Sequence, residues 1–252
     1  MNNKEFTEFY IIQSNSTTMI QSGFIALSAV TVLTIFYLIL AHKKAAFQFT
    51  CFILLWLLYL VLLERSALLE TFDLPPRLPL FVIVPVVFIM FRYTGSKGFS
   101  GILHQLPLHL PILLQSFRIM VELLIFGAFS EGIFSQRVTF EGLNFDVLSG
   151  ITALITGVLI KKHLAEIKLI LAWNIFSIII LSVTVYAFIS TYYSPEYRNI
   201  SSNFALVRWP YLLLPSILLP AAVFMHFISL RQVFIRSRLQ VSHDFSFTDN
   251  TI

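Results

Sequence analysis

The chain has 252 residues, of which 57% are hydrophobic and 12% are charged, and its mean hydropathy is +0.83. An ordinary soluble domain carries roughly 25% charged residues, so this composition excludes a water-soluble globular protein. The apolar residues come in runs of roughly 20 separated by short polar stretches, which is the pattern of transmembrane helices. The sequence therefore predicts an all-α, polytopic transmembrane bundle.

The polar N-terminal stretch, residues 1–19, lacks the basic start and small-residue cleavage site of a secretory signal. The first apolar run is therefore expected to stay as a membrane anchor. This divides the chain into an extracytoplasmic segment (1–19), a transmembrane domain (20–232) and a cytoplasmic tail (233–252).

About seven spans are expected, and the third is short. They cover approximately residues 20–41, 46–64, 78–92, 106–129, 143–160, 167–190 and 209–230.

The connectors between these spans differ in basic residues. One side holds ten, namely Lys43, Lys44, Arg92, Lys97, Lys161, Lys162, Lys168, Arg231, Arg236 and Arg238. The other side holds six, namely Lys4, Arg65, Arg77, Arg137, Arg198 and Arg208. The positive-inside rule places the ten in the cytoplasm, with the N-terminus outside and the C-terminus inside. Because the net charge of +4 is dispersed over span ends, it favours orientation in the membrane, and no nucleic-acid partner is expected.

The two halves of the chain echo one another. Ile53–Trp56 recurs as Ile170–Trp173, and Arg77-Leu-Pro79 recurs as Arg208-Trp-Pro210. Span four would then link two parallel repeats of three spans, an arrangement found in transporters. Chance similarity of apolar sequences is the alternative.

Span four carries charge at its midpoint. Arg118 lies about 12 residues, or roughly 18 Å, from either end of the span. Glu122 is four residues further on the same helical face, so it is the expected ion-pair partner. Gln115 extends this polar stripe. The pair predicts either a substrate or proton site or a buried ion pair that fixes helix packing.

Two further polar positions begin span five, where Asp146 is expected about a turn below the outer boundary and Asn144 just above it. They are candidate partners of Arg118 or of a solute, or else helix caps. In span six, Asn174 beside Trp173 favours interhelical hydrogen bonding. The prolines of span seven free backbone carbonyls, so that span is expected to face the bundle interior.

Neither a metal nor a cofactor is expected. His226 could approach His104 and His109, but no metal-binding spacing is present, and the single cysteine, Cys51, excludes a Cys-based metal site and an internal disulfide. A retinal Schiff base needs a lysine in the middle of a span, and no lysine lies there, which excludes a rhodopsin.

Several stretches together resemble a family of multi-span bacterial inner-membrane proteins whose activity is not established. They are Pro75–Arg77, Phe117–Glu122, Thr139–Gly150, Trp173-Asn174, Pro210–Pro220 and His226–Gln232. Where that family carries Arg in the motif TFEGxNFDxLxG, this chain has Leu143. The resemblance implies an inner-membrane location and topology and is silent about the substrate.

The leading hypothesis is a small carrier or solute-binding protein with a polar site formed by Arg118, Glu122, Asn144, Asp146 and Asn174, with Gln115, His226 and Trp173 as secondary members. The second is a membrane sensor or assembly protein, with a partner protein or a second copy of itself, whose ion pair is structural. The third is an enzyme acting on a lipid, although an enzymatic role is the less favoured. Membrane lipids are expected as neighbours in every case.

Overall fold

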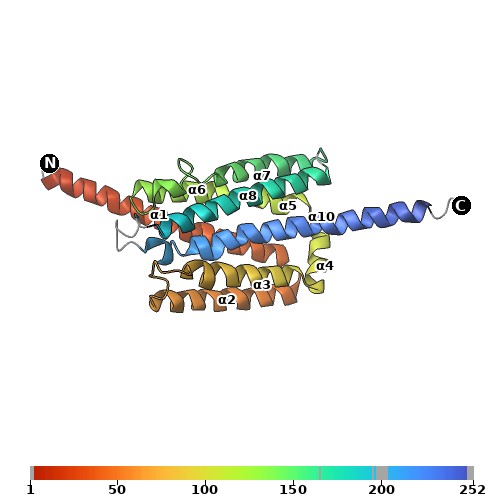
Figure 1. The fold of residues 1–252 in the computed structure, drawn as a ribbon, viewed down its shortest axis with the longest axis horizontal. Helices are drawn as coiled ribbons and strands as arrows, with labels where there is room; N and C mark the ends of the chain where they lie inside the picture. The colour runs from red at the N-terminus through yellow and green to blue at the C-terminus, as the bar shows by residue number, and fades with distance from the viewer. Residues whose placement is uncertain (1–2, 165, 195, 197–203, 249–252) are drawn as a thin grey trace.

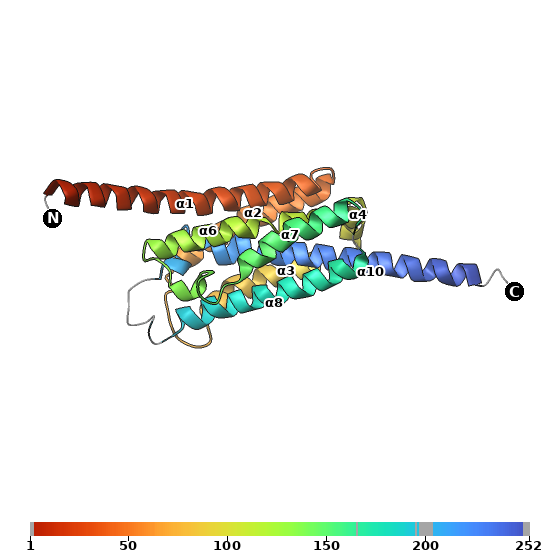
Figure 2. The same cartoon turned by 90° about the horizontal axis from the view of Figure 1, so that it is seen from above.

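The computed structural model describes residues 3–164, 166–194, 196 and 204–248. Within these residues the chain is helical and has no strand. The elements are α1 (Asn3–Ile39), α2 (Lys43–Arg65), η1 (Pro79–Ile83), α3 (Val84–Thr94), α4 (Lys97–Gln105), α5 (His109–Leu114), α6 (Phe117–Ser130), η2 (Gln136–Val138), α7 (Asp146–Lys161), α8 (Ile167–Tyr192), η3 (Ala205–Val207), η4 (Leu214–Leu218) and α10 (Leu219–Thr248). Most helices run along one long axis and form a bundle, with the two termini at opposite ends (Figures 1 and 2).

Five helical stretches of the described chain are long and apolar enough to cross a membrane. They are Ser16–Ile39, Lys43–Arg65, His109–Ser130, Ile167–Tyr192 and Leu214–Ser237. A sixth exists if α3 and α4, bent by 80° relative to each other, are one broken span. A multi-pass membrane bundle is therefore the architecture.

Two predicted boundaries differ from the structure. Helix α1 begins at Asn3, so residues 3–19 of the polar segment are continuous with the first apolar run. Helix α7 has only 16 residues and begins at Asp146. Among the basic residues used to orient the chain, Arg198 lies outside the described residues.

The η4–α10 rod lies at the centre of the bundle. About 67% of its membrane-length window is buried, against 22–39% for the other four candidate spans. It contacts α8, α3, α5 and, through η4, α1. The expectation that the proline-rich seventh span faces the interior is thus confirmed.

A wide π-type turn precedes a proline in both α3 and α10. In η1 the Val84 N–H donates to the Pro79 carbonyl five residues back, and in η4 the Leu219 N–H donates to the Leu214 carbonyl. Each turn is followed at once by a proline, Pro85 or Pro220. A proline has no N–H to give to the carbonyl four residues earlier.

Helix α2 supplies the missing donors at both turns. The Tyr59 hydroxyl donates to the Phe81 carbonyl, at 3.0 Å, and Trp56 Nε1 donates to the Ser216 carbonyl, at 3.1 Å. These are the carbonyls four residues before Pro85 and Pro220. The Trp56 and Tyr59 rings stack with centroids 5.3 Å apart. Every carbonyl left in an apolar environment needs such a partner, so α2 holds both broken helices in register.

Candidate functional site

The polypeptide between α6 and α7, residues 131–145, is inserted into the bundle and is here called the inserted loop. It runs back along α6, as three successive contacts show. Phe140 stacks on Phe126, with centroids 4.7 Å apart, Asn144 Nδ2 donates to Glu122 Oε1 at 2.7 Å, and Asp146 pairs with Arg118. Figure 1 accordingly shows α7 beginning partway along the bundle.

This path corrects the predicted depth of Asp146. Its partner Arg118 is 12 residues before Ser130, the last residue of α6, which is roughly 18 Å of helix. Asp146 therefore lies near the middle of the bundle and not about a turn below its outer boundary. Irregular backbone is tolerated at that depth because protein surrounds it.

Glycine makes the inserted loop possible. A Cβ atom on Gly142 would lie 2.5 Å from the Gln136 carbonyl oxygen and 2.6 Å from Arg137 Cα. The Leu143 N–H donates to the Arg137 carbonyl at 2.9 Å, and the Asn144 N–H to the Thr139 carbonyl at 3.2 Å. These tight turns aim Asn144 and Asp146 inward, which gives the TFEGLNFD segment a structural purpose.

Each of the three guanidinium nitrogens of Arg118 has a protein partner. Its Nε donates to Asp146 Oδ2 at 2.7 Å, its second terminal nitrogen also pairs with Asp146, and Nη1 donates to Ser177 Oγ at 2.5 Å. The side chains of Arg118 and Asp146 are 1% and 7% exposed. The predicted Arg118–Glu122 ion pair is therefore wrong: the partner comes from α7, because the inserted loop brings a carboxylate to the guanidinium in bidentate geometry.

Asn144 is the hub for the neighbouring carboxyl group. Besides Glu122, its Nδ2 reaches the Val138 carbonyl at 3.0 Å, and its Oδ1 accepts from the Asp146 N–H at 3.1 Å and from Thr184 Oγ1 at 2.7 Å. It thus also caps the first turn of α7. Its four hydrogen bonds tie α6, α7 and α8 together.

A second cluster continues from Ser177 toward α10. Ser177 Oγ lies 3.3 Å from His226 Nε2, and His226 Nδ1 lies 2.9 Å from Asn174 Oδ1. Asn174 Nδ2 donates to Ser229 Oγ and to the Ile170 carbonyl, both at 2.8 Å. Because Asn174 Oδ1 can only accept, His226 Nδ1 carries the proton and Nε2 accepts from Ser177.

Of the secondary candidates, Trp173 lies beside this cluster and Gln115 does not. Trp173 stacks on His226 with centroids 5.5 Å apart, and its Nε1 donates to Thr152 Oγ1 at 3.1 Å. Gln115 turns away from Arg118 and donates to the Ala222 carbonyl at 2.9 Å. Gln115 therefore binds α10 and does not extend the polar stripe toward Arg118.

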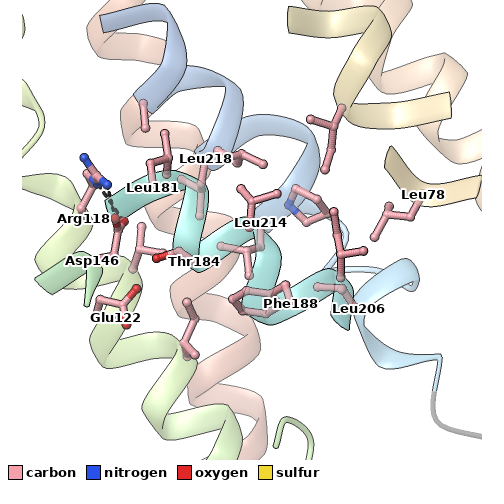
Figure 3. A pocket seen from close by; sticks show the side chains of 18 of the residues that line it. Leu78, Arg118, Glu122, Asp146, Leu181, Thr184, Phe188, Leu206, Leu214 and Leu218 are labelled. Carbon is pink, nitrogen blue, oxygen red and sulfur yellow. Dashed lines mark hydrogen bonds and ion pairs between the residues drawn. The ribbon is translucent and has the colours of Figure 1, made fainter. Parts of the chain in front are cut away.

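A partly open cavity lies beside the Arg118–Asp146 pair. Its volume is about 70 Å³. Arg118, Glu122, Asp146 and Thr184 gather at one end (Figure 3). The rest of the wall is apolar and includes Leu78, Leu181, Phe188, Leu206, Leu214 and Leu218.

Glu122 differs from the other charged groups of this cavity. Its Oε1 accepts from Asn144, but Oε2 is buried and has no hydrogen-bond partner among the described residues. Buried polar atoms are nearly always satisfied. Glu122 therefore has free capacity for a ligand.

Ser177 and Thr184 line or complete this site, but they were not among the residues predicted from the sequence. A signal was present, because Asn174, Ser177, Leu181 and Thr184 follow helical spacing along one face of α8. Isolated hydroxyls in an apolar run are easily overlooked.

No family model, no curated protein and no solved structure matches this chain.

Proposed function

We propose that this chain is a membrane-embedded binding protein or carrier for a small amphipathic molecule. The molecule would place its polar end against Glu122 and its apolar part along the leucine-rich wall of the cavity. The observation that carries the proposal is the partnerless Glu122 Oε2 beside a mainly apolar cavity. Ligand sites typically combine such a wall with a few convergent polar groups.

The partners of Arg118 change the role expected for it. Its charge is already paired with Asp146, and each of its guanidinium nitrogens is bound to Asp146 or Ser177. In this proposal Arg118 is a positioning residue that holds α6, α7 and α8 together, and Glu122 contacts the ligand.

The same contacts favour a second candidate function, in which the polar network is purely structural and the protein acts through a membrane partner or a second copy of itself. The two functions differ in the effect of Glu122→Gln. A ligand-binding protein loses its ligand while its fold persists, because Gln retains an oxygen that can accept from Asn144. If the network is purely structural, the wild-type protein binds no ligand either.

The proposal includes seven crossings in the bacterial inner membrane, with the N-terminus outside. The alternating direction of successive helices supports it, since α1, α2, α3, α5–α6, α7, α8 and α10 follow one another up and down the bundle, with α7 beginning partway along it. The matching π-type turns before Pro85 and Pro220 support an internal duplication.

The direct test is equilibrium binding of single-chain amphiphiles to the purified protein in nanodiscs. Saturable binding that Glu122→Gln weakens about tenfold or more, which is at least 1.4 kcal/mol, is expected. Glu141→Gln, an exposed position on the inserted loop, is the matched control and should bind as the wild type does.

A further inference from the structure

A groove on the side of the bundle adjoins the cavity. It is lined by α8, by Ile83 of η1 and by α10, including Phe227 and His226. Helix α10 contacts both α8 and α3, so it forms the floor between them. Ser182, on the rim, is exposed.

Four apolar side chains line both the groove and the cavity: Ile83, Leu181, Val185 and Leu219. They come from three different elements and form a neck between the two spaces, here called the apolar neck. The two spaces are thus neighbours, separated by these four side chains, with the groove on the side of α8 and Glu122 on the cavity side.

The rim of the groove is adapted to lipid. The Ser182 hydroxyl donates to the Ile178 carbonyl at 2.8 Å, within its own helix, so it presents no unsatisfied polar group to the bilayer. The two nitrogens of His226 are already engaged by Asn174 and Ser177. An occupant of the groove therefore meets a surface suited to hydrocarbon.

We propose that the ligand enters laterally from the bilayer and is a single-chain lipid with a small, uncharged hydroxyl headgroup, seated with its hydroxyl at Glu122 and its chain passing through the apolar neck into the groove. This inference rests on the proposed function and names its substrate class. A charged head crossing four apolar side chains would lose its hydration without compensation. A hydroxyl costs less to desolvate and can donate to the partnerless Glu122 Oε2.

The test uses hexadecanol carrying a photoreactive diazirine either beside the hydroxyl or at the chain end, with the full chain in nanodiscs. After irradiation, adducts are located by mass spectrometry. The head-proximal probe should label the cavity wall, for example Phe188 or Leu214, and the chain-end probe should label the groove, for example Ile178 or Phe227. Unlabelled hexadecanol should compete with both, whereas hexadecanoate and hexadecyltrimethylammonium should not.

Val185→Trp should plug the neck and reduce cavity labelling about tenfold. Val183→Trp, on the same helix at a position 36% exposed, should leave labelling unchanged. If Val185→Trp does not fold, the positions of the wild-type adducts decide alone: chain-end labelling outside the groove contradicts lateral entry.

The outcomes separate the two proposals. Labelling lost in Glu122→Gln but retained in folded Val185→Trp overturns lateral entry and leaves the binding site standing. Equal competition by the charged amphiphiles overturns the uncharged headgroup. If hexadecanol gives no saturable labelling but another amphiphile binds at Glu122, only the lipid class is overturned. If no amphiphile binds at all, the proposed function is overturned as well.

Discussion

Arg118 of α6 and Asp146 of α7 form a bidentate ion pair in the middle of the bundle, where both side chains are almost fully buried. They are 28 residues apart, and the inserted loop between them brings them together. The chain re-enters the bundle before α7 begins, which two full-length transmembrane helices joined by an outer loop would not do.

Asp146→Asn should destabilise the protein by about 3–5 kcal/mol, because it leaves a buried guanidinium without its counter-charge. The free energy of unfolding can be measured by SDS titration in mixed micelles. Asp73→Asn, at an exposed position, is the control and should change little. Replacing both partners by Leu should cost less than Asp146→Asn alone, and an effect below about 1 kcal/mol for Asp146→Asn would contradict the role given to the pair.

The charges of this pair could be found from sequence, and Asp146 was a candidate partner of Arg118, but Glu122 was the favoured one. Arg118, Glu122, Asp146 and Asn174 stand out because ionisable and amide groups are rare within apolar runs. Helical spacing then favoured Glu122 as the partner of Arg118, since both lie on one face. The course of the inserted loop depends on the tight turn at Gly142 and on contacts with α6 and α8, and no local pattern specifies those contacts.

The fold, like the site, could be predicted from the sequence only in part. Hydropathy located the long helices because burial in lipid depends on composition alone. It did not show that α1 extends into polar residues, that α7 starts at mid-depth, or that π-type turns precede Pro85 and Pro220. Those features depend on which neighbour satisfies each freed carbonyl, and Trp56 and Tyr59 lie far away in sequence.

Close packing of α7 against α5 and α6 requires two glycines. A Cβ atom on Gly150 would lie 2.6 Å from Ile119 Cγ1 and 2.9 Å from its backbone nitrogen, and one on Gly157 would lie 2.4 Å from Leu113 Cγ. Gly150→Ala should therefore cost about 1–3 kcal/mol through overpacking. Gly101→Ala on α4, where no atom lies within 4 Å, should be neutral or slightly stabilising. Thermal unfolding of both variants in one detergent provides the comparison, and equal melting temperatures would count against the close approach.

The donors from α2 to the proline-freed carbonyls can be tested by a double-mutant cycle. Trp56→Phe should cost about 1–3 kcal/mol because it leaves the buried Ser216 carbonyl unsatisfied. Pro220→Ala restores a backbone N–H four residues after Ser216, so the cost of Trp56→Phe should shrink in that background. Tyr37→Phe, at a side chain 75% exposed, is the control. Additive costs in the cycle would show that Trp56 does not serve this carbonyl.

The proposed orientation predicts which residues a membrane-impermeant maleimide can reach. In a Cys51→Ser background, Asp73→Cys should react in intact spheroplasts. Leu164→Cys, at a position 69% exposed on the opposite end of the bundle, should react only after permeabilisation. The reverse pattern would show that the topology is inverted. Reaction of both residues in intact cells would contradict the alternating directions of the spans.

The central claim is that Glu122 holds a small molecule inside the bundle, and native mass spectrometry of the protein extracted gently from its own membrane tests it most directly. Wild type and Glu141→Gln should each retain a bound mass of a few hundred daltons, consistent with a single ligand in the cavity. Glu122→Gln should fold with the same stability and lose that mass. A wild-type protein that carries no bound molecule, or a Glu122→Gln variant that retains it in full, would contradict the claim.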